Sequence, residues 1–252
     1  MITPGAKQAL LYSYMTVLNP SDEAILLSPS WASYEPMISI IGGVPVNVPV
    51  DRKNFHPDMD AIRSSITDRT RMIMVNSPCN PTGAVYTREE IEEIVSIAIE
   101  HDLWIISDEI YSRLIWNGGE HVSPATIEGG KERTIVISGW SKTWAMTGMR
   151  VGFLAGPEQA VRAAVKCQAN SASHIPTFMM EAARVALDCD DHVERFSDAY
   201  RHRRNLIVQG LEDIPGLRIV NPEGAFYLFI DVTGTGMSDV QFADGALKAG
   251  VQ

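Results

Sequence analysis

Short apolar runs alternate with longer amphipathic stretches along the first part of the chain. The apolar runs have the length of buried strands and lie at residues 24–27, 44–50, 72–75, 103–107 and 134–138. Apolar residues at helical spacing fall between or before them, at residues 5–18, 31–41, 58–66 and 88–100. This alternation predicts an α/β fold in three layers, with a mostly parallel sheet covered by helices on both faces.

The pattern changes after Gly152. Residues 158–214 are dominated by helix-forming sequence, and Pro215-Gly216 closes that stretch. Two short strands at 217–220 and 225–231 and a helix at 242–249 come next. We therefore predict three parts: a large domain at residues 1–157, a helical connector at 158–214, and an incomplete smaller α+β domain at 215–252.

Charge and composition exclude several classes of protein. The net charge of −10 argues against a nucleic-acid partner, and the basic cluster at 201–204 is interpreted as a solvated helix face. No apolar run approaches the roughly 20 residues of a membrane span, and the start does not resemble a signal peptide, so we expect a cytoplasmic protein. The three cysteines and six histidines lack metal-site spacing and are interpreted as structural or surface residues, with no metal site expected.

Polar residues follow the ends of several predicted strands or open a predicted helix. In parallel α/β sheets, ligands bind at the carboxyl ends of the strands, so these residues form one group of candidates. The candidates are Gly5, Ala6, Lys7, Trp31, Asn80, Asp108, Tyr111, Ser141, Lys142 and Arg150. We expect all of them on the same edge of the sheet.

Taken one at a time, most candidates have ordinary structural explanations. Gly5 suits a helix-entry turn, and Trp31 suits a core aromatic position. Asn80 begins an Asn-Pro-x-Gly turn, and Asp108 suits a helix N-cap or a buried ion pair. The Thr-Gly-Thr-Gly run at 233–236 follows no strand-to-helix pattern and is interpreted as a flexible turn.

Four motifs occur in a fixed order. They are Asn80-Pro81-Thr82-Gly83, Asp108-Glu109-Ile110-Tyr111, Gly139-Trp140-Ser141-Lys142 with Thr147-Gly148-Met149-Arg150-Val151-Gly152 after it, and Gly224-Ala225-Phe226-Tyr227. Their order and spacing resemble the fold-type I pyridoxal-phosphate-dependent aminotransferases, in the bacterial aspartate and aromatic branch, over nearly the whole chain. An unrelated doubly wound nucleotide binder is disfavoured, because no Walker or Rossmann glycine motif opens a helix.

The resemblance implies catalytic roles for three residues and pyridoxal 5′-phosphate as the cofactor. Lys142 would form the Schiff base with the cofactor and act as general acid and base, helped by a pKa that burial and Arg150 lower. Asp108 would face the pyridine nitrogen and keep it protonated. Tyr111 and Asn80 would donate to the phenolic oxygen of the cofactor.

The resemblance also implies binding residues for the cofactor phosphate and the substrate. The phosphate would lie on the backbone N–H groups of Gly5, Ala6 and Lys7, with Ser141 and Arg150 completing the site. For substrate binding, the resemblance implies two residues: Trp31, which would stack on the ring, and Asn80, which could reach a substrate carboxylate. The substrates would be an amino acid and a 2-oxo acid, and the assembly a homodimer.

The sequence departs from the family pattern at both ends and within the lysine motif. It lacks a counterpart to the N-terminal segment and to the rest of the small domain, including an arginine that holds the substrate carboxylate. Three readings of function stay open: an aminotransferase, a cofactor-binding fragment inactive without further segments, and a lyase or decarboxylase of the same family. Gly139 and Trp140 also occupy positions where the family places other residues, and Gly139 shifts phosphate binding toward Ser141.

Overall fold

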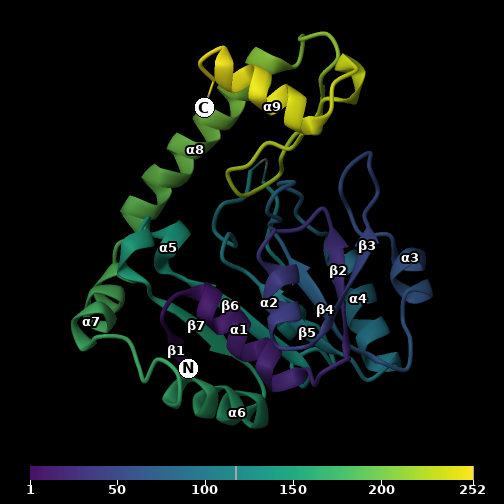
Figure 1. The fold of residues 1–252 in the computed structure, drawn as a ribbon. Coiled ribbons are helices and arrows are strands. Elements are labelled where there is room, and N and C mark those ends of the chain that lie inside the picture. Colours follow the sequence, from purple (N-terminus) through teal and green to yellow (C-terminus); the bar gives the residue numbers. More distant parts are fainter. Residues whose placement is uncertain (117, 252) are drawn as a thin grey trace.

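A twisted sheet of seven strands forms the centre of the computed structural model, which describes residues 1–116 and 118–251 (Figure 1). The strand order is β1-β7-β6-β5-β4-β2-β3. Strands β2 to β6 run parallel, whereas β7 is antiparallel to both β6 and β1. The strands are β1 (Ile2–Thr3), β2 (Glu23–Ser28), β3 (Val44–Pro49), β4 (Thr70–Asn76), β5 (Trp104–Asp108), β6 (Thr134–Gly139) and β7 (Gly152–Ala155). The predicted mostly parallel α/β fold is confirmed.

Helices cover both faces of this sheet, because successive strand residues point to opposite sides. In β2, Ile25 and Leu27 pack with α3 (Met59–Ser64) and α4 (Arg88–Glu100) in one core. Ala24 and Leu26 point the other way and belong to a second core. Three helices build that second core: α1 (Ala6–Val17), α2 (Tyr34–Ile40) and α6 (Glu158–Ala169).

Helix α4 illustrates how the sequence specifies one of these layers. Thr87 and Glu90 form a capping box at its start, in which each side chain accepts a hydrogen bond from the backbone N–H of the other residue. Ile91, Ile94 and Ile97 are fully buried against the sheet. Each such side chain stabilises the fold by about 1.5–3 kcal/mol relative to exposure, so packing outweighs the cap.

The C-terminal part of the chain is less deeply packed. The long helix α8 (Asp190–Leu211) leads away from the sheet, and α9 (Asp239–Lys248) lies near its far end (Figure 1). Among the described residues, α8 has one buried residue, Val193, and α9 has none. The remaining elements are α5 (Trp140–Thr143), α7 (Thr177–Ala186), α8 (Asp190–Leu211), β8 (Arg218–Ile219), β9 (Ile230–Asp231) and α9 (Asp239–Lys248).

Several sequence-based element predictions need correction. Strands β1 and β7 were not predicted, because two to four residues carry too little periodicity and each depends on a partner far along the chain. Trp31 lies before α2 rather than within it. The strand expected at 225–231 is reduced to β9, and the region 158–214 contains three separate helices, of which α6 packs on the sheet. The domain boundaries at residues 157 and 214 stay predictions.

Cys79, Cys167 and Cys189 are free thiols, and Cys79 is buried. The run at 233–236 forms a short 3-10 helix, Thr233–Thr235, ending in Gly236 at positive φ, which fits the predicted turn. Within residues 1–116 and 118–251, no helix has both the length and the apolar character needed to cross a membrane.

Candidate active site

The carboxyl ends of β4, β5 and β6 meet at one edge of the sheet and open into a cavity. Asn76 and Asp108, the last residues of β4 and β5, are directly paired in register. The cavity has a volume of about 310 Å³, within the range of small-molecule sites. Nine of the ten candidate residues line it: Ala6, Lys7, Trp31, Asn80, Asp108, Tyr111, Ser141, Lys142 and Arg150. Gly5, the tenth, lies beside the cavity against Arg150.

Asp108 is a buried carboxyl group at the floor of the cavity. Tyr34 donates its hydroxyl to Oδ2 of Asp108 at 2.8 Å, and the Ile110 backbone N–H donates to Oδ1 at 3.2 Å. Burial raises the pKa of Asp108 to about 6, while these two hydrogen bonds oppose the increase. A cation placed against the carboxyl group would favour its ionised form. The position therefore suits a buried partner for a protonated ring nitrogen.

Lys142 lies on the short helix α5, directly after β6. Its ammonium group is partly buried, and this burial lowers the pKa of Lys142. The charge of Arg150 lowers that pKa further, whereas Asp108 acts in the opposite direction. Both causes named in the sequence analysis are therefore present. A lowered pKa increases the fraction of neutral amine, which is the form that acts as nucleophile or base.

The start of α1 and the Arg150 side chain form a site for an anion. The first N–H groups of a helix have no partner within it, and here they belong to Ala6 and Lys7. Gly5 precedes them at φ 83°, and a side chain on Gly5 would occupy the space of the Arg150 guanidinium. Gly152 likewise allows close approach, because a Cβ there would meet the Ala6 backbone. The glycines leave room for a guanidinium group beside a helix N-terminus.

Aromatic side chains form two further walls. Trp31 packs edge-on against Tyr34, with ring centroids 5.3 Å apart, and Lys7 Nζ lies 4.8 Å from the Trp31 ring. The hydroxyls of Tyr111 and Tyr227 are 2.6 Å apart. Burial and then the hydrogen bond with Tyr227 raise the pKa of Tyr111, while Asn80 opposes this. Tyr111 therefore stays a neutral phenol that can donate a hydrogen bond.

The two unusual residues of the lysine motif have structural reasons. A Cβ on Gly139 would lie 2.7 Å from the Val151 carbonyl oxygen, so the backbone geometry disfavours a hydroxyl-bearing side chain there. Trp140 is buried, stacks on Trp144 and donates its indole N–H to the Ala183 carbonyl of α7 at 2.9 Å. Trp140 therefore connects α5 to α7 and does not face the cavity.

Sequence reasoning missed several residues of the cavity. Asn76 ends β4, and its side-chain amide donates to the Asp108 carbonyl at 3.0 Å; its place after an apolar run was a usable signal. Tyr34 has the burial of a core aromatic, and nothing local indicates its bond to Asp108. Tyr227 lies in a motif that was recognised without a site role, and its contact with Tyr111 spans 116 positions. Thr147 also lines the cavity.

The donor set of the cavity suits an organic anion with an aromatic ring rather than a metal ion. It combines two amines, a guanidinium, amide and phenol groups and a single carboxylate, Asp108. Divalent metals prefer several carboxylates, imidazoles or thiolates. Across residues 1–116 and 118–251, no group of three or more such side chains could hold a metal ion.

The fold and cavity define an α/β protein with a partly buried lysine of lowered pKa at the carboxyl edge of its sheet. The chain belongs to the aminotransferase class I and II family, whose model matches residues 1–251. An aspartate aminotransferase of Musicola paradisiaca is 41% identical over 243 residues, covering 96% of this chain and 61% of the relative. The aspartate/prephenate aminotransferase of Thermus thermophilus is 40% identical over 256 residues, covering 100% of this chain and 66% of the relative.

Solved structures agree with this assignment. An aromatic aminotransferase from Pyrococcus horikoshii superposes with a TM-score of 0.96 at 40% identity, covering 98% of this chain and 67% of that one. Thermus thermophilus aspartate aminotransferase with maleate gives 0.94 at 39% identity, covering 100% and 66%. The family, fold class and sequence resemblance are confirmed. The chain spans about 61–66% of the length of the first two curated relatives.

Proposed function

We propose that this chain carries the cofactor site of a pyridoxal-phosphate-dependent aminotransferase. The observation that carries the proposal is the placement of Lys142, Asp108 and Arg150 around one cavity. The pKa of Lys142 is lowered and that of Asp108 is raised, each first by burial. An amine of lowered pKa, a buried acidic group and a guanidinium at a helix N-terminus are what this cofactor requires.

The residues present fit the cofactor group by group. The phosphate would be held by the Ala6 and Lys7 N–H groups, the Ser141 hydroxyl and Arg150. Tyr111 and Asn80 would donate to the phenolic oxygen, and Trp31 would contact the ring. When bound, the cofactor supplies an electron sink for the bond broken at the substrate Cα.

The chain's own residues then supply proton transfer and orientation. Asp108 holds a proton on the ring nitrogen by charge, and Tyr34 keeps its carboxyl group oriented through the bond to Oδ2. Lys142 removes the proton from the substrate Cα as a neutral amine, which its lowered pKa makes available. Asn80 lines the cavity, and in this proposal its side-chain amide binds a substrate carboxylate.

The reaction would move an amino group between an amino acid and a 2-oxo acid. Relatives named aspartate, aspartate/prephenate and aromatic aminotransferases support this substrate class. We place the protein in the cytoplasm as a homodimer. Support for association comes from apolar side chains exposed on α7 and beside it, including Phe178 at 67% and Leu187 at 50%.

Single-turnover chemistry tests this proposal. The protein is loaded with pyridoxal phosphate and mixed with a panel of amino acids without any 2-oxo acid acceptor. An aminotransferase releases one equivalent of the matching 2-oxo acid per loaded chain. Carbon dioxide or an elimination product would indicate the decarboxylase or lyase instead, and no product from a loaded protein would indicate a binding fragment.

A further inference from the structure

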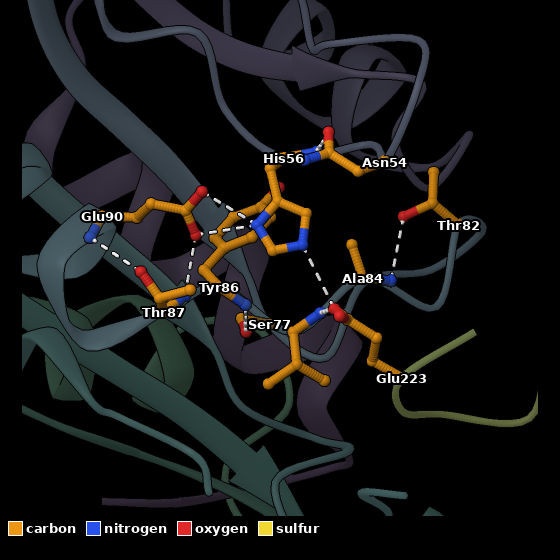
Figure 2. Close-up of polar contacts among 10 residues, drawn as sticks. Asn54, His56, Ser77, Thr82, Ala84, Tyr86, Thr87, Glu90 and Glu223 are labelled. Carbon is orange, nitrogen blue, oxygen red and sulfur yellow. Dashed lines mark hydrogen bonds and ion pairs between the residues drawn. The ribbon is translucent and has the colours of Figure 1, made fainter. Parts of the chain in front are cut away.

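His56 lies outside the cavity, where it joins three parts of the chain (Figure 2). Its Nδ1 is 2.8 Å from Glu90 at the start of α4, and its Nε2 is 3.2 Å from Glu223. The same Glu223 oxygen accepts the Val85 N–H at 2.9 Å. Tyr86 lies beside the imidazole, with ring centroids 6.1 Å apart. The sequence pattern alone indicates only a structural or surface position for this histidine.

The two ring contacts determine the protonation state that the site favours. A neutral imidazole has one N–H donor, whereas here both nitrogens face carboxylate oxygens, which only accept. The imidazolium satisfies both contacts, and the side chain of His56 is 13% exposed. Bonds to Glu223 and then Glu90 accordingly raise the pKa of His56 to about 9. The ion pairs are therefore formed at neutral pH.

Glu223 belongs to the segment of residues 222–227, whose last residue, Tyr227, lines the cavity; we call it the wall segment. Its backbone is held between two loops: the Glu223 and Gly224 N–H groups both donate to the Gly83 carbonyl at 2.8 Å, and the Trp116 N–H donates to the Glu223 carbonyl at 2.7 Å. At its other end, Tyr227 lines the cavity and meets the Tyr111 hydroxyl.

The loop that carries His56 contacts the C-terminal part at two further points. Phe55 packs edge-on against Phe229, with centroids 5.6 Å apart, and Arg218 donates to the Arg52 carbonyl at 3.0 Å. Glu223 thus makes one of several contacts between the sheet with its covering helices and the less packed C-terminal residues. Among the described residues that make these contacts, His56 is the side chain that pairs with two carboxylates, Glu90 and Glu223.

We propose that His56 is a positioning residue whose imidazolium ties the wall segment to the start of α4 and so holds Tyr227 in the cavity wall. The proposal rests on the proposed function for the identity of the cavity's ligand. The groups that face the imidazole are Glu90 from α4, Glu223 from the wall segment and Tyr86 from the loop before α4. Since the pKa is raised, the tie is complete below about pH 6.5 and is lost as pH rises through about 9.

Amide exchange and cofactor affinity in full-length variants test the proposal. His56→Gln and Glu223→Gln, alone and together, are compared with the surface control His101→Gln at pH 7. The exchange rates of the Glu223, Gly224 and Ala225 amides should rise about tenfold in each single variant, with little further increase in the double variant. A change of one unit in the pKa of His56 corresponds to a tenfold change in an equilibrium constant. The expected effect is limited to that factor because the Glu223 side chain is 47% exposed, so solvent weakens its ion pair with His56.

Pyridoxal phosphate affinity separates positioning from stability alone. The dissociation constant should rise several-fold in His56→Gln and Glu223→Gln and stay at the wild-type value in His101→Gln. Unchanged exchange would overturn the tie, and faster exchange with unchanged cofactor affinity would overturn the positioning role. Histidine NMR adds a direct reading, because a His56 titration near the ordinary 6.5 rather than about 9 contradicts the double ion pair.

The experiment also distinguishes failure of the proposed function. If wild-type protein binds no pyridoxal phosphate, that proposal fails, and the cavity-wall role fails with it. The exchange and NMR measurements do not depend on the cofactor. They would still decide whether His56 ties the wall segment to α4.

Discussion

The sheet with its covering helices and the C-terminal part differ sharply in how they are stabilised. Every strand from β2 to β6 has buried apolar side chains, and one hydrophobic core lies on each face of the sheet. After α6, the larger apolar side chains are often exposed, as at Phe178, Leu206 and Val240. The sheet can therefore hold functional groups in place by extensive packing, whereas the C-terminal part is held by two smaller apolar clusters and by polar contacts.

This difference explains how the cavity is divided. Asp108 ends a strand, and Lys142 and Asn80 come shortly after strands, whose positions are determined by the cores. Tyr227, the last residue of the wall segment, comes from the less packed part and lines the cavity. Groups that need fixed geometry thus lie on the sheet with its covering helices, which we call the rigid region. The part of the cavity wall with more freedom to adjust to a substrate lies on the C-terminal part.

The largest expected effect concerns the rigid region. Lys142→Arg keeps a positive charge on α5 but removes the amine whose pKa is lowered, because a guanidinium stays protonated. Loss of a general acid and base costs about 10²–10⁴-fold in rate, so the single-turnover rate should fall by at least that much. Stopped-flow measurement with the best amino donor checks this. A rate within tenfold of wild type would contradict the assigned role.

Matched truncations should expose the difference in packing. Ile94→Ala empties part of a fully buried site in α4 and should lower the free energy of unfolding by about 2–5 kcal/mol. Leu247→Ala on α9, where the side chain is 59% exposed, should change it by no more than about 0.5 kcal/mol. Urea unfolding measures both, and similar costs would remove the contrast between the two regions.

A functional group in the rigid region should cost stability. The pKa of Asp108 in the folded protein is about 6, above its ordinary 3.8, so stability without cofactor falls as pH rises from about 4 through 6. Asp108→Asn should therefore be about 1–3 kcal/mol more stable than wild type at pH 8, with the difference shrinking toward pH 4. Asp102→Asn, at a 99% exposed side chain, is the control. A pH-independent difference would count against burial as the cause.

The smallest expected effect uses the same local device in both regions. Thr87 caps α4 and Ser238 caps α9, each in a capping box. Thr87→Ala should lower the global free energy of unfolding by about 1 kcal/mol. Ser238→Ala should instead speed amide exchange within α9 while global unfolding stays within about 0.5 kcal/mol. Equal global effects would mean that α9 unfolds together with the sheet.

Sequence patterns predicted the features that depend on the periodicity of apolar residues and on the spacing of motifs. Helix α4 was expected at its observed bounds, and the strands ending at Asn76 and Asp108 were placed to within a few residues. Nine of the ten candidate residues line the cavity because the ends of parallel strands meet at one edge. Their chemical roles stay predictions.

Contacts between distant residues could not be predicted in this way. Tyr34 to Asp108 and His56 to Glu223 join positions 74 and 167 residues apart. Both involve residue types that occur in most cores and on most surfaces, so no local pattern marks them. Strand β1 was missed for the same reason, since Ile2–Thr3 is a strand through its pairing with β7.

The central claim, that Lys142 anchors the cofactor, is tested most directly by borohydride reduction of the protein mixed with pyridoxal phosphate, followed by peptide mass spectrometry. We predict one stable adduct, on the peptide that contains Lys142, and its loss in Lys142→Arg. Modification spread over surface lysines such as Lys53 and Lys131, with Lys142 unlabelled, would contradict the account.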